Sequence, residues 1–122
     1  MKVSIITVCY NSAETIENTI QSVVSQKYDN IEYIIVDGLS TDATLKIIES
    51  YKNKLAKLIS EKDNGIYDAI NKGIKNATGD IIAILHADDF YTNENVISTI
   101  VNSFIQYKVD AVYGDLQYVE RL

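Results

Sequence analysis

Residues 3–11 read VSIITVCYN, in which an apolar run over residues 3–9 is followed by a tyrosine and an asparagine. Four further short apolar runs follow along the chain, at residues 31–36, 55–59, 81–85 and 109–113. Several of them are nearly continuous in Ile and Val, which is typical of strands buried on both faces of a parallel sheet. Apolar residues at helical spacing separate the runs, as in βα units. The pattern predicts an α/β fold, a mostly parallel sheet flanked by helices.

Four segments between the runs have the apolar spacing of helices. The first follows Asn11 and Glu14, three residues apart as in a capping box, and is expected to reach about Gln26. The second follows residues 40–42, whose side chains suit the unpaired amides of a first helical turn. A third is expected between residues 65 and 79, and a fourth from near residue 93. Together with the strands, these helices predict a single domain over residues 1–122.

Composition excludes several classes of protein. At 122 residues, with 47% hydrophobic and 23% charged residues, the chain has the profile of one soluble globular domain. It contains no apolar run near the ~20 residues of a membrane-spanning helix and no signal-peptide pattern, so we expect a cytoplasmic protein. The lone Cys9 cannot form an internal disulfide. A net charge of −6 argues against nucleic-acid binding and predicts that a diphosphate ligand would need a cation.

The ligand crevice of an open α/β sheet lies beyond the carboxyl ends of its strands. The residues that follow each of the first four apolar runs are therefore the candidates for a site. This edge is acidic and contains an aromatic side chain. The segments are Tyr10-Asn11, Asp37-Gly38, residues 61–65, and His86-Ala87-Asp88-Asp89.

Asp88 and Asp89 are the strongest single feature, because adjacent carboxylates repel each other unless a cation or hydrogen-bond donors offset the repulsion. Mg²⁺ and Mn²⁺ take oxygen ligands and keep water or phosphate oxygens in their shell. One or two protein carboxylates therefore suffice where the substrate supplies a diphosphate. The same pair could instead turn the chain and cap the next helix, and the spacing alone does not decide between the two.

Other residues at this edge have two interpretations each. Asp37 could accept from an N–H of a nucleobase, although residues 37–42 also suit an ordinary turn and helix start. Tyr10 could stack on a base or cover the core. His86, the only histidine, is interpreted as a hydrogen-bonded structural residue. Asp68 would stand one helical turn from a helix start that faces the crevice.

Taken in order, these segments resemble the nucleotide-binding half of family 2 glycosyltransferases of the GT-A fold. Residues 3–11 resemble the family's first strand, residues 22–26 its first helix, and residues 37–42 its Asp-Gly-x-Ser-Thr-Asp turn. Residues 65–74 resemble a form found in members that build bacterial surface polysaccharides. Residues 77–89 look like the approach to the acidic metal-binding motif, so the resemblance covers nearly the whole chain.

The resemblance implies a role for each matching residue. Tyr10 and Asp37 would hold the base, Asp88 the ribose side, and Asp89 a Mn²⁺ or Mg²⁺ ion that bridges the two phosphates. Two positions depart from the family's pattern: His86 stands where Asp or Asn is common, and Ile70 stands where many relatives have Arg. The implied substrate-binding residues are Val8, Tyr10, Asn11, Asp37, Asp68 and Asp88, and the implied metal ligands are Asp89 and Asp88.

The implied function is transfer of a sugar, with inversion, from a nucleoside diphosphate sugar to an acceptor hydroxyl, in polysaccharide or cell-surface glycan synthesis. A UDP-sugar is the expected donor, and a glycan or lipid-linked molecule the expected acceptor. The full-length protein would work at the inner face of the membrane.

The resemblance leaves the catalytic residue unidentified. The family's general base is a carboxylate well beyond the acidic motif, and no later carboxylate (Asp110, Asp115 or Glu120) sits in a recognisable acceptor motif. We therefore expect the base beyond Leu122, in an acceptor half that this chain does not contain. We expect this chain to be a fragment that binds the donor but transfers its sugar poorly.

Three alternatives have to be separated from this hypothesis. A receiver-type signalling domain would carry its acidic pair after the first strand, whereas the pair here follows the fourth. A nucleotidyltransferase would need a glycine-rich basic loop after the first strand, where this chain has residues 10–14, YNSAE. A non-catalytic nucleotide-binding module remains open.

Overall fold

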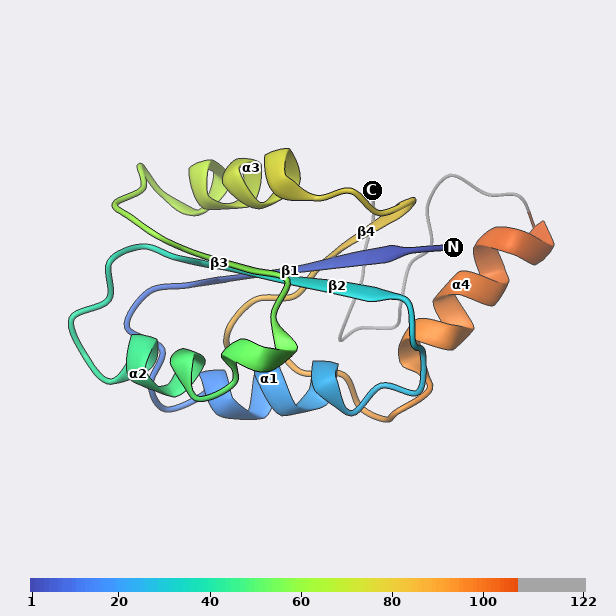
Figure 1. Ribbon diagram of the computed structural model, residues 1–122, viewed down its shortest axis with the longest axis horizontal. Coiled ribbons are helices and arrows are strands. Elements are labelled where there is room, and N and C mark those ends of the chain that lie inside the picture. Colours follow the sequence, from blue (N-terminus) through green and yellow to red (C-terminus); the bar gives the residue numbers. More distant parts are fainter. Residues whose placement is uncertain (108–122) are drawn as a thin grey trace.

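The structure is a computed structural model that describes residues 1–107 (Figure 1). The elements in chain order are β1 (Val3–Cys9), α1 (Ile16–Val24), β2 (Ile31–Asp37), α2 (Thr44–Glu49), the 3₁₀ helix η1 (Lys52–Lys54), β3 (Lys57–Ser60), α3 (Ile66–Asn76), β4 (Ile81–Ile84) and α4 (Val96–Tyr107).

Several predictions fall on residues outside the described part of the chain. These are the predicted strand at 109–113 and the carboxylates Asp110, Asp115 and Glu120. Leu122, beyond which the general base is expected, also lies outside the described residues. The position of the base therefore stays a prediction.

The four strands form one parallel sheet in the order β3-β2-β1-β4, which confirms the predicted fold class. Cys9 at the end of β1 is in register with Asp37 at the end of β2, and Ile6 is in register with Ile84 at the end of β4. The carboxyl ends of all four strands therefore lie at one edge.

Helices cover both faces of the sheet, with α3 on one face and α1 and α2 on the other (Figure 1). Every residue of β1 is buried, because successive side chains of the central strand alternate between the two layers. Ile5 packs with Ile16 and Ile20 of α1, while Ile6 packs with Ala69 of α3. This two-sided burial explains the nearly continuous Ile and Val of the run.

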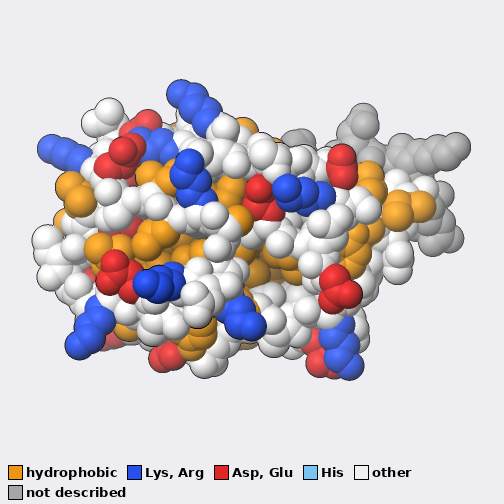
Figure 2. All heavy atoms as spheres, in the orientation of Figure 1, with side chains coloured by type: hydrophobic (Ala, Val, Ile, Leu, Met, Phe, Trp, Pro, Cys, Tyr) orange, Lys and Arg blue, Asp and Glu red, His pale blue; other side chains and the backbone are white. Residues whose placement is uncertain are grey.

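The edge strand β3 lies across the middle of the face shown in Figure 2, between α3 and the helices α1 and α2. Hydrophobic side chains form a band here, and lysine, aspartate and glutamate side chains surround it. Lys57, the first residue of β3, is exposed and donates to Asn76 Oδ1 at 2.7 Å. A short strand with a lysine on it limits unwanted pairing of a free sheet edge.

Helix starts were the least accurate part of the prediction. The capping box of Asn11 and Glu14 is wrong, because α1 begins at Ile16 after Thr15, which caps it with no side-chain bond. Asn11 instead has a left-handed backbone, with φ 48°, and its Oδ1 accepts from the amide of Thr41 at 2.8 Å. Its side chain thus satisfies an amide ahead of α2, which could not be inferred from neighbouring residues.

Other boundaries shift by a few residues. α1 ends at Val24 and not near residue 26, and α4 begins at Val96 and not near residue 93. β3 begins at Lys57, later than the predicted residue 55. None of the helices between residues 1 and 107 combines the length and the apolar character needed to cross a membrane.

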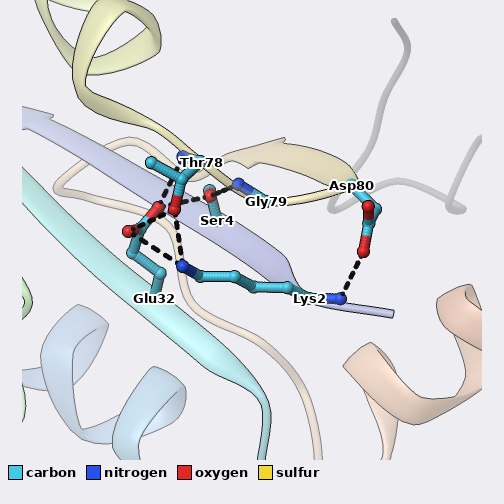
Figure 3. A network of polar contacts seen from close by, with 6 residues as sticks. All are labelled: Lys2, Ser4, Glu32, Thr78, Gly79 and Asp80. Atoms are coloured by element: carbon cyan, nitrogen blue, oxygen red, sulfur yellow. Dashed lines mark hydrogen bonds and ion pairs between the residues drawn. The ribbon is translucent and has the colours of Figure 1, made fainter.

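A polar network around Glu32 closes the opposite, amino edge of the sheet (Figure 3). The Glu32 carboxylate accepts from the Ser4 hydroxyl at 2.7 Å and from the amide and hydroxyl of Thr78 at 2.8 and 2.9 Å. Lys2 forms an ion pair with it at 3.4 Å. Burial acts to raise the pKa of Glu32, but these donors outweigh it and lower the pKa from 4.5 to about 2.

Candidate functional site

An open cleft of about 430 Å³ lies at the carboxyl edge of the sheet, beside the ends of β1 and β4. The chain places β2 and β3 on one side of β1 and β4 on the other, so this is the topological switch point, where open α/β sheets bind their ligands. The cleft is lined by Val8, Cys9, Tyr10, Ser12, Asp63, Gly65, Ile66, Ala69, His86, Ala87 and Asp88.

The cleft brings together three of the predicted site residues, Val8, Tyr10 and Asp88. Tyr10 comes directly after β1, and 59% of it is exposed, so its ring is available to a ligand. Asn11, Asp37, Asp68 and Asp89 do not line the cleft. Of these, Asn11 holds the loop before α2, since its backbone N–H donates to Ser40 Oγ at 2.8 Å.

The Asp37 carboxylate is fully buried and accepts hydrogen bonds on both oxygens. Its Oδ1 accepts from Ser40 Oγ at 2.5 Å and from Cys9 Sγ at 3.5 Å. Its Oδ2 accepts from the Ser40 amide at 3.1 Å and from Ser60 Oγ at 2.9 Å. Asp37 therefore ties the ends of β1, β2 and β3 to the loop after β2, and its contact with a base stays a prediction.

Cys9 takes part in this arrangement as a hydrogen-bond donor. Burial, followed by the neighbouring Asp37 carboxylate, raises the pKa of the Cys9 thiol well above its usual range. The sulfur therefore keeps its proton and is available as a donor to Asp37.

The acidic loop after β4 is held through its backbone, and its carboxylates are exposed. The Asp89 amide donates to the carbonyl of His86 at 3.0 Å, and the Thr19 hydroxyl lies 2.9 and 2.6 Å from the carbonyls of Ala87 and Asp89. The side chains of Asp88 and Asp89 bind no other group in residues 1–107. They do not cap a helix, because α4 begins only at Val96.

Two exposed, adjacent carboxylates of this kind fit a hard divalent cation that completes its shell elsewhere. Within the described part of the chain, no group of three or more His, Cys, Asp or Glu side chains could hold a metal ion. Asp88 and Asp89 would therefore share the ion with water or with oxygen atoms of a ligand in the cleft.

Asp63 belongs to the candidate segment of residues 61–65 but was given no role of its own; it lies in the loop between β3 and α3 and lines the cleft. Its Oδ1 accepts from the amide of Gly65 at 3.1 Å. Its Oδ2 covers Gly38, where an added Cβ would lie only 2.6 Å from that oxygen. The available signal was its position after the third strand, together with the two glycines that let the chain approach it.

Asp68 lies outside the cleft and supports this same loop. Its Oδ2 accepts from the amide of Asn64 at 2.9 Å and forms an ion pair with Lys72 at 3.5 Å. The Asn64 amide and the Lys72 ammonium lower the pKa of Asp68, although desolvation opposes them.

Comparison with known proteins agrees with this geometry. The model of the family described as glycosyl transferase family 2 matches residues 4–121. An Escherichia coli relative, a UDP-Glc:alpha-D-GlcNAc-diphosphoundecaprenol beta-1,3-glucosyltransferase, is 41% identical over 101 residues, which are 80% of this chain and 39% of that protein. The poly-beta-1,6-N-acetyl-D-glucosamine synthase of Staphylococcus aureus is 34% identical over 109 residues, 88% of this chain and 26% of that protein.

Solved structures share the fold. Staphylococcus aureus TarS in complex with UDP-GlcNAc superposes with a TM-score of 0.83 at 26% identity, covering 98% of this chain and 37% of that one. The mannosyltransferase of Pyrobaculum calidifontis in complex with GDP-Man and Mn²⁺ gives 0.78 at 29% identity, covering 84% and 32%. The chain thus spans about two fifths or less of the length of these proteins. A family match over nearly all of its residues, on a parallel sheet that superposes on glycosyltransferases of known structure, shows that this chain belongs to glycosyl transferase family 2.

Proposed function

We propose that this chain binds the nucleoside diphosphate sugar donor of a glycosyltransferase, together with Mn²⁺ or Mg²⁺. The observation that carries the proposal is the cleft at the switch point, which is lined by an exposed tyrosine and by part of an acidic loop. The carboxylates of that loop bind no other group among residues 1–107. A nucleotide needs an aromatic surface for its base and a cation for its diphosphate, and the cleft supplies the aromatic ring and the cation's ligands.

Each residue that the resemblance singles out has a proposed role. Tyr10 stacks on the base, next to Val8 in the cleft lining, and Asp88 contacts the ribose. Asp89 would hold the divalent ion, which would supply positive charge to the diphosphate. Asn11 and Asp37 shape the base end, since both hold the Ser40 loop in place. Asp68 contributes indirectly, because it accepts from the Asn64 amide and so holds the loop that precedes α3.

The reaction proposed for the whole protein is a single displacement at the anomeric carbon, which inverts its configuration. A divalent ion held by Asp89 would supply positive charge for the departing diphosphate. A general base activates the acceptor hydroxyl; we assign no described residue to that task and propose that the base lies beyond Leu122.

We propose a UDP-sugar as donor and a glycan or lipid-linked acceptor, in polysaccharide or cell-surface glycan synthesis on the cytoplasmic side of a membrane. The Escherichia coli relative is named for a UDP-Glc donor and a diphosphoundecaprenol-linked acceptor, and two TarS structures contain UDP-GlcNAc and UDP. The mannosyltransferase is a counterexample with GDP-Man, so the base needs a test of its own.

Isothermal calorimetry of the 122-residue chain with UDP, with and without Mn²⁺, tests the proposal. We expect Mn²⁺ to strengthen binding, and we expect Asp89→Ala to remove this dependence. Asp29→Ala, a change of an exposed aspartate just before β2, is the matched control and should keep it. Equal binding of UDP with and without metal would contradict the proposed metal site.

A further inference from the structure

We infer that Asp63 recognises the nucleobase of the donor and selects uracil by accepting its ring N–H. This inference rests on the proposed function of the cleft as a nucleotide site. It adds a residue that determines base specificity, in the loop between β3 and α3. This loop precedes in sequence the residues that are proposed to contact the donor's ribose and the metal.

Asp63 is placed beside the stacking surface. A Cβ added to Gly38 would lie 2.6 Å from Asp63 Oδ2 and 3.5 Å from Tyr10 Cδ1, so both atoms lie close to the same point beside Gly38. Asp63 and Tyr10 both line the cleft. A base stacked on the Tyr10 ring would therefore present its edge toward the carboxylate of Asp63.

The two carboxylate oxygens of Asp63 differ in their hydrogen bonding. Oδ1 accepts from the Gly65 amide, whereas no group among residues 1–107 donates to Oδ2. The Asp37 carboxylate differs, because both of its oxygens already accept from Ser40 and from a second partner. Of the two carboxylates, Asp63 has the acceptor that a ligand can use without breaking an existing bond.

A charged cluster fixes the loop that carries Asp63. The Lys72 ammonium donates to the carbonyl of Lys62 at 2.8 Å and forms ion pairs with Glu61 at 3.3 Å and Asp68 at 3.5 Å. Asp68 in turn accepts from the Asn64 amide. Residues on both sides of Asp63 are thus anchored to α3, which reduces the entropy that the loop would lose on binding a ligand.

One unbonded oxygen suits one donor. Uracil presents a single ring N–H between two carbonyl groups, whereas cytosine has an acceptor at the same ring position. Guanine presents two adjacent N–H groups, which pair best with both oxygens of a carboxylate. Because the Gly65 amide occupies Oδ1, the geometry favours uracil over guanine as well as over cytosine.

Calorimetry of the 122-residue chain with UDP, CDP and GDP in the presence of Mn²⁺ tests the inference. We expect the chain to prefer UDP. Asp63→Asn should weaken UDP by about ten- to a hundredfold and leave CDP unchanged or stronger, because the amide then directs an N–H at the base. Asp29→Asn, which removes an equal charge outside the cleft, should keep the preference.

The ratio of UDP to CDP affinity separates recognition from a general loss of structure, which would weaken both nucleotides alike. If Asp63→Asn does not fold by circular dichroism, Asp63→Ser replaces it, with the same expected fall in the ratio. An unchanged ratio, or no preference in the unsubstituted chain, would overturn the role of Asp63 and leave the proposed function standing. Failure of the unsubstituted chain to bind any of the three nucleotides would overturn both.

Discussion

Replacement of Glu32 by Gln is expected to destabilise the chain at neutral pH and much less in acid. The Glu32 side chain is 14% exposed and accepts three hydrogen bonds besides its ion pair with Lys2 (Figure 3). A glutamine can still accept on one oxygen, but its amide nitrogen would replace the second acceptor and would face the Lys2 ammonium. The network would therefore lose its charge and at least one of its bonds.

The size of the effect follows from the pKa. A folded-state pKa of about 2, against the usual 4.5, corresponds to at most roughly 3.5 kcal/mol, since each pKa unit is worth about 1.4 kcal/mol. Lys2 is 38% exposed and screened by solvent, so we expect about 1–2 kcal/mol. Because the folded-state pKa is lowered, this stability is present above pH 4.5 and is lost as the pH falls from 4.5 toward 2.

Urea unfolding followed by circular dichroism, at several pH values from about 7 to 3, measures the difference in unfolding free energy. The difference between the unsubstituted chain and Glu32→Gln should be largest at neutral pH and should shrink in acid. Glu49→Gln, a change of an exposed residue at the end of α2, should show no such trend. A difference that is constant over this pH range would refute the assignment of the lowered pKa to this network.

Two further predictions address the packing of the sheet and the base end of the cleft. Gly73→Ala should lower the free energy of unfolding by about 1–3 kcal/mol in urea titration, because its Cβ would lie 2.5 Å from Ile6 Cγ2. A variant of unchanged stability would show that α3 can move away from β1 at little cost. Tyr10→Ala should weaken UDP binding about tenfold in calorimetry, because the ring would no longer stack on the base. The melting temperature should be nearly unchanged, because the Tyr10 side chain is 59% exposed. Equal affinity of the variant and the unsubstituted chain would exclude stacking on Tyr10.

Local patterns were sufficient for the strands within residues 1–107 and for part of the cleft. The apolar run of residues 3–9 predicted a strand buried on both faces, and its bounds agree with β1. Strand polarity then placed Tyr10 and Asp88 at one edge, because parallel strands end on the same side, and both residues line the cleft. The helix starts failed where a cap came from a distant segment, as with Asn11 and the Thr41 amide.

The sequence by itself determined the alternation of strands and helices, the parallel sheet and the edge at which polar residues collect, because these depend on local spacing and on burial. Only the tertiary structure decided which carboxylates are available to a ligand. The Asp37 carboxylate already accepts hydrogen bonds from Ser40 and Ser60. The Asp63 carboxylate lies beside Gly38, and one of its oxygens accepts no hydrogen bond from residues 1–107. Those states depend on loops that meet only after the strands have paired, so neighbouring residues in the chain do not encode them.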